Sequence, residues 1–527
     1  MAFSSALTLT DLNDYIAPSQ ACIKPVEVKK SDNPQGSSEI KVDDQGGYYE
    51  ISKDGGEEKL EQASITLNDC LACSGCVTSA ESVLITMQSQ EELYKVLRAN
   101  NDGSQPHKTI VVSISPQSRA SLAAKYQLSM IQVHQRLVAF FKHHLGVHHV
   151  FDIAFARDLS LVEGAREFIE RYQAYLEQGG DALEKQWQEQ QQQQDTSAPR
   201  SHRRQGGRAQ QQQQQLPMLA SSCPGWVCYA EKTHGEVLPF ISTTKSPQQM
   251  MGSLVKDYLA TKTNTRPDQI YHVAVMPCYD KKLEASRPDF FQEEFNTRDV
   301  DCVLSTGEVD KMLTEQSVDF LQLPDVPVDD IFNKVGLDPV TQALTAYGTE
   351  GSSSGGALEY ILACAAKQLF HMDSVSTANG RIVIKTGKNA DFKEYFLHAD
   401  DGRVLLRFAS AYGFRNIQNI VRKVKSGKCS YHFVEVMACP GGCANGGGQL
   451  PPQQLDQVTS VAVKDWVQHV EAIYRTCSGV PPDANDAIQA VYNEWMQLRS
   501  PDHVAKLLRT QYHAVTQNLG NPLATKW

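Results

Sequence analysis

The amino-acid sequence predicts an α/β protein in which mostly parallel sheets are flanked by helices. Short apolar runs, typical of buried strands, alternate along the chain with longer segments of helical periodicity. This alternation is typical of β-α-β units, in which a helix returns the chain to the next parallel strand. The chain has 527 residues, of which 41% are apolar. That length corresponds to about three domains of ordinary globular composition.

The expected elements follow from these runs in chain order. Strands are expected at residues 109–114, 150–154, 216–220, 272–276, 302–304 and 433–436. Helices are expected at residues 116–145, 161–176, 247–262, 307–315, 357–370 and 417–425. Ser246 and Pro247 are typical of an N-cap and a first helical position, so they mark the start of one helix.

Two stretches without apolar periodicity interrupt this pattern. Residues 29–60 are polar, charged and rich in glycine, so we expect a flexible arm or linker. Residues 188–215 contain two glutamine runs and predict a disordered surface insertion. After Leu455 the strand signals become few and helical runs dominate. The chain is therefore expected to divide into an N-terminal segment, an α/β core and a helical C-terminal extension, at residues 1–105, 106–455 and 456–527.

Charge and hydropathy argue against several classes of protein. The formal net charge of −11 does not suit a chain that coats nucleic acid or an anionic membrane. The sequence contains no run of 18 apolar residues, and the first 15 residues lack the basic and apolar regions of a signal peptide. We therefore expect a cytoplasmic protein. In that compartment a disulfide framework of the 13 cysteines is not expected, and cysteines that cluster are more often metal ligands or catalytic residues.

Three cysteines, Cys70, Cys73 and Cys76, lie within seven residues. Four-cysteine zinc sites usually combine two separated pairs, so this triple favours an iron–sulfur cube, with structural zinc as the alternative. The bacterial ferredoxin run would place a further cysteine where this chain has Ala80. A fourth ligand must then come from elsewhere, and Cys22 is the candidate. The alternative is that Cys22 is a free thiol.

A second set of cysteines is dispersed along the chain. Cys223 and Cys278 follow predicted strands directly, and Cys439 and Cys443 follow the last predicted strand in a glycine-rich loop. Because the carboxyl ends of parallel strands meet at one crevice, we expect these four thiols to surround one buried cluster. The alternative is a set of unrelated buried cysteines at strand ends. The remaining cysteines are expected to be core or incidental thiols, at positions 228, 302, 364, 429 and 477.

The motifs around these cysteines resemble the three signature motifs of iron-only ([FeFe]) hydrogenases. They read Cys-Pro-Gly-Trp at 223–226, Met-Pro-Cys-x-x-Lys at 276–281 and Glu-x-Met-Ala-Cys-Pro-Gly-Gly-Cys at 435–443. The resemblance runs from about residue 109 to the C-terminus, apart from the glutamine-rich insertion. It implies a two-lobed core in which the four motif cysteines hold a [4Fe–4S] cubane. In the enzymes, the last of these cysteines also bridges to a di-iron unit.

One departure from the enzymes bears directly on function. Where hydrogenases have a thiol that relays protons, this chain has Ser222, whose hydroxyl is a far poorer relay. The stretches 11–25, 69–76, 112–126 and 244–258 instead closely resemble eukaryotic Nar-type proteins. These are cytosolic iron–sulfur assembly factors related to the nuclear prelamin A recognition factor. The resemblance implies two [4Fe–4S] clusters, a ferredoxin-like N-terminal segment and no hydrogenase activity.

The resemblance also implies partners. The expected role is to connect the early assembly scaffold to the late targeting complex, in the cytoplasm and also in the nucleus, without nucleic acid or membrane as partners. Trp527 resembles an aromatic docking signal for the targeting complex, and the alternative is that it packs on its own helical domain. Lys281 matches a lysine near the di-iron unit of the enzymes, and we expect it to pair with Glu284. An active hydrogenase and a simple electron carrier remain the alternative functions.

Overall fold

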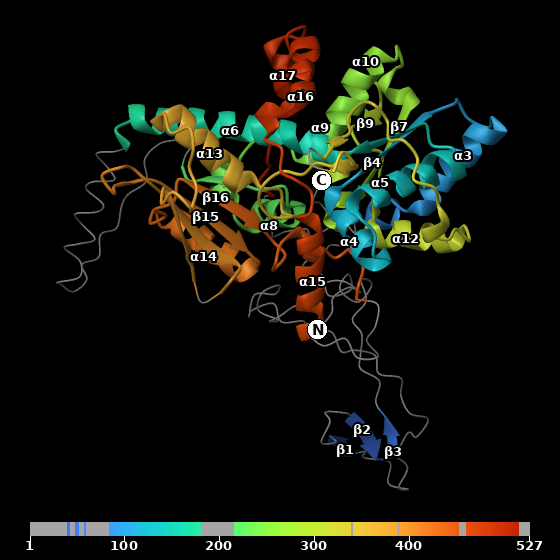
Figure 1. Cartoon of the computed structure of the whole chain (residues 1–527), viewed down its shortest axis with the longest axis horizontal. Coiled ribbons are helices and arrows are strands. Elements are labelled where there is room, and N and C mark those ends of the chain that lie inside the picture. Colours follow the sequence, from blue (N-terminus) through green and yellow to red (C-terminus); the bar gives the residue numbers. More distant parts are fainter. Residues whose placement is uncertain are drawn as a thin grey trace, which may run out of the picture.

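The computed structural model describes five ranges of the chain together with three short strands between residues 39 and 59; the ranges are 84–180, 216–338, 341–387, 389–452 and 460–515. Two lobes, each built on one sheet, lie side by side (Figure 1). Several sequence predictions fall outside the described residues, namely Cys22, Cys70, Cys73, Cys76, the insertion 188–215 and Trp527.

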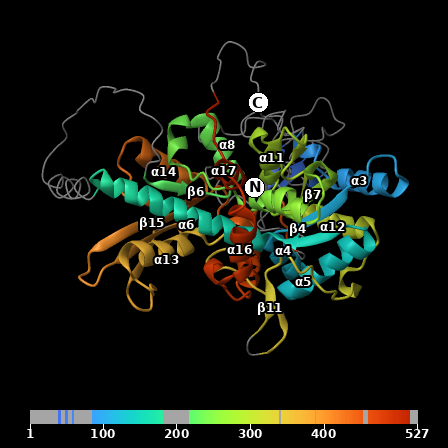
Figure 2. The same ribbon diagram turned by 90° about the horizontal axis from the view of Figure 1, so that it is seen from above.

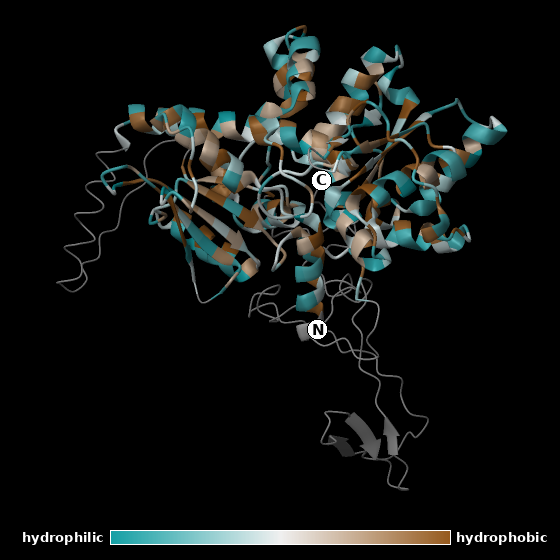
Figure 3. Ribbon diagram, in the orientation of Figure 1, coloured by the Kyte–Doolittle hydropathy of each residue, from teal (hydrophilic) through white to brown (hydrophobic). Residues whose placement is uncertain are grey.

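The first lobe is built on a sheet of four parallel strands in the order β10-β7-β4-β5. Their bounds are β4 (Thr109–Ile114), β5 (His149–Asp152), β7 (Ile270–Met276) and β10 (Cys302–Ser305). Both faces of this sheet are covered. In β4, Val112 packs against one helical layer and its neighbour Val111 packs against the other. The apolar colouring in Figure 3 accordingly lies on the strands and on the helix sides that face them.

Helices form a layer on each face of this sheet. One layer contains α3 (Gln90–Asp102), α4 (Pro116–Tyr126), α5 (Met130–Val138) and α12 (Thr306–Glu315). The other contains α9 (Pro247–Ser253) with its continuations η5 (Leu254–Leu259) and α10 (Ala260–Lys262), and the first half of α6 (Ile153–Glu177).

The second lobe has a five-stranded sheet in the order β13-β14-β15-β16-β6. The strands are β6 (Met218–Ala220), β13 (Ile382–Thr386), β14 (Phe392–His398), β15 (Val404–Tyr412) and β16 (Phe433–Met437). β15, β16 and β6 are parallel, and β13 and β14 add an antiparallel edge. One face is covered by α8 (Pro224–Thr233) and α14 (Phe414–Lys425), and the other by α13 (Ala357–Phe370) and the second half of α6.

Helix α6 belongs to both lobes. Its 25 residues begin directly after β5, with the Asp152 carboxylate accepting a hydrogen bond from the N–H of Ala154 at 2.8 Å. Phe155 packs in the first lobe and Phe168 packs in the second. Seen from above, α6 crosses from one lobe to the other (Figure 2). The helix therefore fixes the relative position of the two sheets.

The helices near the end of the chain pack into the lobes. They are α15 (Ser460–Tyr474), α16 (Asp486–Val491), η11 (Tyr492–Met496) and α17 (Pro501–Leu508). Tyr474 of α15 lies in the core beside α4, while Trp495 and Leu508 lie in the core beside α9. Among the described residues, no helix combines the length and the apolar character needed to cross a bilayer.

Several expectations from the sequence need correction. The single helix predicted at 116–145 is interrupted, because Gln127 adopts a left-handed φ of 54° and Ser129 then caps a new helix. The antiparallel edge of the second sheet was not predicted. β14 reads Phe-Lys-Glu-Tyr-Phe-Leu-His, which lacks a long apolar run, and its side chains are mostly half-buried. β13 begins with only three apolar residues, Ile-Val-Ile, and its side chains are mostly exposed.

The stretch 29–60 also differs from the linker that was expected there. It contains three short antiparallel strands, β1 (Glu39–Val42), β2 (Tyr48–Ile51) and β3 (Glu57–Lys59). The second strand reads Tyr-Tyr-Glu-Ile, and aromatic and β-branched residues favour extended backbone even in a polar stretch. The polar composition of the stretch therefore predicted a linker and gave no indication of these short strands.

A buried carboxylate supports the strand that leads to the last cysteine loop. Glu435 of β16 is 2% exposed. The Tyr412 hydroxyl donates a hydrogen bond of 2.6 Å to its Oε2, while Oε1 has no partner among the described residues. Burial, and next the nearby Glu359 carboxylate, raise the pKa of Glu435 to about 7. The folded protein therefore retains this proton at pH values where the unfolded chain has lost it.

The first prediction concerns the substitution Glu435→Gln. A raised carboxyl pKa contributes stability below the unfolded value, and that contribution is lost as pH rises towards 7. Glutamine still accepts the Tyr412 hydrogen bond but cannot ionise. The variant should therefore gain stability relative to wild type between pH 5 and pH 8, by on the order of 2 kcal/mol. Thermal unfolding at both pH values measures this gain. The exposed Glu91→Gln variant is the control, and an equal stability difference at both pH values would contradict the prediction.

Candidate metal centre

The four dispersed cysteines each follow a strand of one of the two sheets. Cys223 lies after β6, at the N-cap of α8, where Pro224 takes the first helical position. Cys278 lies between β7 and the short helix α11 (Asp280–Ala285). Cys439 follows β16, and Cys443 begins the 3-10 turn η9 (Cys443–Asn445). Since β7 belongs to the first lobe and β6 and β16 belong to the second, both lobes contribute thiols.

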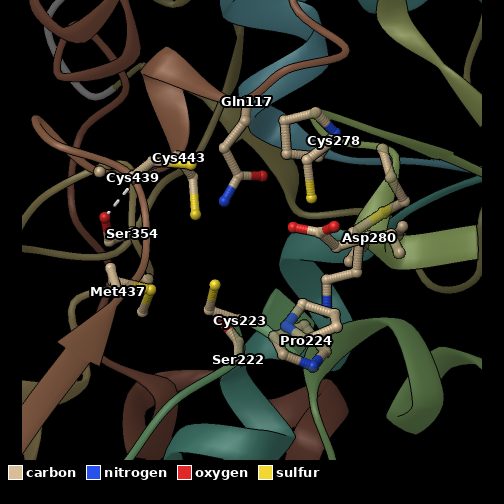
Figure 4. Close-up of a pocket in the computed structure, with 18 of the residues that line it drawn as sticks. Gln117, Ser222, Cys223, Pro224, Cys278, Asp280, Ser354, Met437, Cys439 and Cys443 are labelled. Atoms are coloured by element: carbon tan, nitrogen blue, oxygen red, sulfur yellow. Dashed lines mark hydrogen bonds between the residues drawn. The ribbon is translucent and has the colours of Figure 1, made fainter. Parts of the chain in front are cut away.

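These four cysteines line one cavity between the lobes. The sulfur atoms of Cys223, Cys278 and Cys443 point toward the same central space (Figure 4). The cavity has a volume of about 50 Å³, which is room for several water-sized groups. No group of three or more His, Cys, Asp or Glu side chains in the described ranges is arranged around a single metal ion. The thiols thus surround a cavity and are not arranged as the ligands of a single metal ion.

Hydrogen bonds of 2.5 to 3.5 Å hold the backbone near Cys223, Cys439 and Cys443. The Ser221 hydroxyl accepts the Cys223 N–H at 3.0 Å and donates to the carbonyl of Val436 at 2.5 Å. The Cys223 sulfur accepts the N–H of Ala438 at 3.5 Å. The Ser354 hydroxyl accepts the Cys443 N–H at 3.2 Å. The second-lobe segments that carry Cys223, Cys439 and Cys443 are therefore held to each other and to the loop of Ser354.

Two glycines are needed for the close approach of the last loop. Gly442 has a left-handed φ of 81°, and a Cβ there would lie 2.2 Å from the Ser354 hydroxyl oxygen. A Cβ at Gly446 would lie 2.4 Å from the carbonyl oxygen of Pro277, beside Cys278. A side chain at Gly442 would push the loop away from Ser354 in its own lobe, and a side chain at Gly446 would push it away from Pro277 in the other lobe.

Burial dominates the electrostatics of the four thiols. It raises the pKa of Cys443 to about 12, with the neighbouring Cys223 as the next cause. The pKa values of Cys278 and Cys439 lie well above the ordinary value, first because of burial and then because of nearby acidic groups and thiols. Four thiolates in this cavity would repel one another unless a cationic group lay between them. Thiolates are the soft ligands that iron–sulfur clusters and zinc prefer.

The structure also places the residues that distinguish this chain from the enzymes. Ser222 lines the cavity next to Cys223. The Lys281 ammonium donates to the Glu284 carboxylate at 2.9 Å, as expected, and both are largely buried. Gln248 extends this pair, because its Nε2 donates to the carbonyl of Lys281 and to Glu284. Lys281 is thus held by its own segment at the edge of the cavity.

Sequence reasoning missed several residues that line the cavity, among them Asp280, Gln117 and Ser354. The Asp280 carboxylate points into the space beside Cys278, and Gln117 points in from α4 (Figure 4). Ser354 lies in the loop before α13. Asp280 could have been found, because it occupies a variable position of the Met-Pro-Cys-x-x-Lys motif. Gln117 and Ser354 are distant in sequence, and only the folded chain brings them to the cavity.

The other described cysteines lie elsewhere. Cys302 and Cys477 pack with the core of the first lobe, and Cys364 and Cys429 pack in the second. Cys228 is half-buried on α8 and does not line the cavity. The prediction that Cys302, Cys364, Cys429 and Cys477 pack as small apolar side chains is therefore confirmed.

Comparisons with known proteins agree with this architecture. Residues 108–447 match the family described as the iron only hydrogenase large subunit, C-terminal domain. A single-residue variant of the apo [FeFe]-hydrogenase HydA1 from Chlamydomonas reinhardtii is 24% identical with a TM-score of 0.60, over 80% of this chain and 98% of that chain. The structure of HydA(deltaEFG), titled for stepwise H-cluster assembly, has the same TM-score and coverage at 25% identity. The predicted hydrogenase-like fold is confirmed.

Relatives that match this chain over nearly their whole length are named as assembly factors and not as hydrogenases. A protein of Xenopus tropicalis named cytosolic Fe-S cluster assembly factor narfl is 48% identical, over 100% of this chain and 99% of that protein. Cytosolic iron-sulfur assembly component 3 of Rattus norvegicus is 47% identical over the same shares. A relative from Danio rerio, also named cytosolic Fe-S cluster assembly factor narfl, is 50% identical over 86% of this chain and 98% of that protein. The chain therefore belongs to the family of cytosolic iron–sulfur cluster assembly factors, whose core has the fold of the iron-only hydrogenase large subunit.

Proposed function

We propose that this chain acts in cytosolic iron–sulfur cluster assembly and carries two [4Fe–4S] clusters. The convergence of four thiols from both lobes on one cavity supports the core site most directly. Cys223, Cys278, Cys439 and Cys443 would hold the cluster there. The second cluster would be held by Cys22, Cys70, Cys73 and Cys76. The spacing of the last three supports it, and Cys22 is the candidate fourth ligand because it is the only other cysteine in the first 222 residues. The names of the full-length relatives support the assembly role.

The residues around the core site fit such a group. The donor set is four thiols, the cavity is larger than one water molecule, and the glycines of the last loop bring backbone close to it. A bound [4Fe–4S] cluster would supply one-electron redox chemistry. This chain would supply the thiolates, exclude water by burial and fix the loop through Ser221 and Ser354.

The second prediction concerns the core ligands. Replacing Cys439 with alanine should remove about four irons per chain, because a cube with three thiolates in a buried site is weakly held. It should also lower thermal stability, since a group bound only by the folded state stabilises that state. Anaerobic iron and acid-labile sulfide analysis measures the loss. The matched control is Cys364→Ala, whose thiol packs in the second lobe away from the cavity. A Cys439→Ala protein with full iron content would refute the core assignment.

An active [FeFe] hydrogenase is the second candidate function, because the fold is that of the enzymes. We propose that the chain lacks this activity. Ser222 lies at the cavity where the enzymes have a relay thiol, and losing a positioned proton-transfer group typically costs about 10²–10⁴-fold in rate. The third prediction is therefore that anaerobically purified protein shows no infrared carbonyl or cyanide bands. With reduced methyl viologen it should evolve no more hydrogen than a cluster-only control. Either signal above that control would favour the enzyme.

We propose further that the chain connects the early scaffold to the late targeting complex, and that Trp527 docks on the targeting complex. The fourth prediction follows from this role. Interface tryptophans often contribute about 2 kcal/mol or more, so deleting Trp527 should weaken binding roughly thirty-fold while iron content stays unchanged. Binding of the purified targeting complex by full-length and truncated protein measures the effect. Unchanged affinity would leave packing on the helical domain as the explanation for this residue.

A further inference from the structure

A second cavity opens beside the loop that carries Cys439 and Cys443. Its volume is about 1010 Å³, far larger than that of the four-cysteine cavity. Its walls are α14, the start of β14 and the described part of α15. Pro440 and Gly441 form part of its floor. We call this cavity the basic groove, because four cationic side chains line it.

Four cations line the basic groove: Arg415, Arg422, Lys423 and Lys464. All four are exposed, and among the described residues none of them forms an ion pair with a carboxylate. Two of them contact neutral groups: Lys423 lies 3.5 Å from the Tyr431 hydroxyl, and Arg422 donates to the Asn419 side chain at 3.4 Å. This concentration of positive charge stands out in a chain whose net charge is −11.

The acidic side chain that lines the groove is turned to the cysteine loop. Asp391 accepts the N–H of Gly441 through its Oδ1 at 2.8 Å. This hydrogen bond holds the loop in place. The four cations outnumber this one carboxylate among the described lining residues, which leaves an excess of three positive charges. Most of the remaining polar lining is made of neutral amides, including Asn389, Asn419 and Gln468. Amides and cations together suit carboxylates as binding partners.

The loop that carries Cys439 and Cys443 separates the basic groove from the four-cysteine cavity, because Pro440 and Gly441 of that loop line the groove. Gly441 is exposed and lies between Cys439 and Cys443 in the sequence. Asn445, two residues after Cys443, lines the groove and is 6% exposed. Its Nδ2 donates to the Pro440 carbonyl at 3.1 Å, while its Oδ1 has no partner among the described residues. A macromolecule seated in the groove would therefore touch the backbone that carries two of the four thiols.

We propose that the basic groove docks an acidic protein partner, whose carboxylates meet Arg415, Arg422, Lys423 and Lys464 beside the cysteine loop. The purpose of the docking rests on the proposed core cluster, since such a partner would exchange electrons or iron with it. The binding itself depends only on the charges of the groove. Opposite charges at such a surface mainly speed association and set its salt dependence.

Nucleic acid fits the groove less well than an acidic protein. Single strands are usually held by several aromatic rings on which successive bases stack. Among the described lining residues, the aromatic one is Phe392, which is half-buried and lies under the Lys423 ammonium at 6.0 Å. That ring is already covered by a cation, so the groove offers a strand charge without a stacking surface.

The test uses the full-length, anaerobically purified protein and a fluorescein-labelled oligoglutamate peptide as the probe. Arg422→Glu combined with Lys423→Glu reverses two charges of the groove. The matched control is Lys95→Glu combined with Arg98→Glu, two exposed cations on α3, which lies at the opposite end of the molecule (Figures 1 and 2). The control makes the same change of net charge away from the groove. Fluorescence anisotropy at several salt concentrations gives the affinities.

The groove variant should bind the peptide about tenfold more weakly or worse than wild type, with a shallower salt dependence, and the control should change less than about twofold. Equal weakening in both variants, or none in either, would overturn the proposal. So would a labelled single-stranded oligonucleotide that binds the groove more tightly than the peptide. If the first variant unfolds, Arg415→Glu with Lys464→Glu, on the facing walls, carries the same expectation.

Iron analysis of the same samples distinguishes the proposed docking groove from the proposed core cluster. Loss of peptide binding with full iron content would support the docking surface on its own. Unchanged peptide binding would reject the groove and leave the core cluster assignment intact. A wild-type protein that binds peptide but contains no core iron would support the groove and reject the proposed function.

Discussion

The arrangement of the core depends on one constraint: strand ends from two different sheets must meet at a single cavity. β7 delivers Cys278 from the first sheet, while β6 and β16 deliver Cys223 and Cys439 from the second. Because β6 and β16 are parallel neighbours, their carboxyl ends lie at the same edge of the second sheet. The first sheet must then present its own carboxyl edge to that one. Any shift in the registry between the lobes would separate Cys278 from the other three thiols.

Several contacts maintain this registry without help from a bound group. α6 packs its two halves in different lobes, and α15 packs on α4 in the first lobe. The Trp466 indole of α15 donates to the carbonyl of Leu450 at 2.8 Å, just beyond the glycine-rich loop. Glu471, on the same helix, accepts the N–H of Ser353 in the loop that holds the Cys443 backbone. The helices near the C-terminus are therefore part of the frame around the cavity.

The sequence predicted most of what lies near the cavity, because local signals and the site coincide there. The strand 109–114 and the helix 357–370 match β4 and α13 residue for residue. The placement of four cysteines after apolar strands was enough to bring them to one crevice. The predictions failed at elements whose conformation depends on tertiary contacts. The half-buried strand β14, second from the edge of its sheet, lacks a long apolar run, and the break at Gln127 has no glycine or proline to indicate it.

The same limit applies to individual side chains of the site. Spacing placed Cys278 and Lys281, and with them the Lys281–Glu284 pair. It could not place Ser354, which reaches the cavity from a loop nearly ninety residues before Cys443. Nor could it indicate that Glu435 is buried with an unpaired oxygen, since a glutamate inside a strand is more often exposed. Contacts between segments that are distant in sequence depend on tertiary packing. The local periodicity of the sequence does not predict them.

The length of α6 has a mechanical consequence. A helix of 25 residues extends about 37 Å, and its two halves are anchored in different cores. Swinging one lobe away from the other would require this rod to bend or unravel, and it contains no proline at which to kink. Rotation of one whole lobe against the other is therefore costly. A change in the width of the cavity would instead come from a local segment such as the loop around Gly441 and Gly442, where both residues already have left-handed φ values.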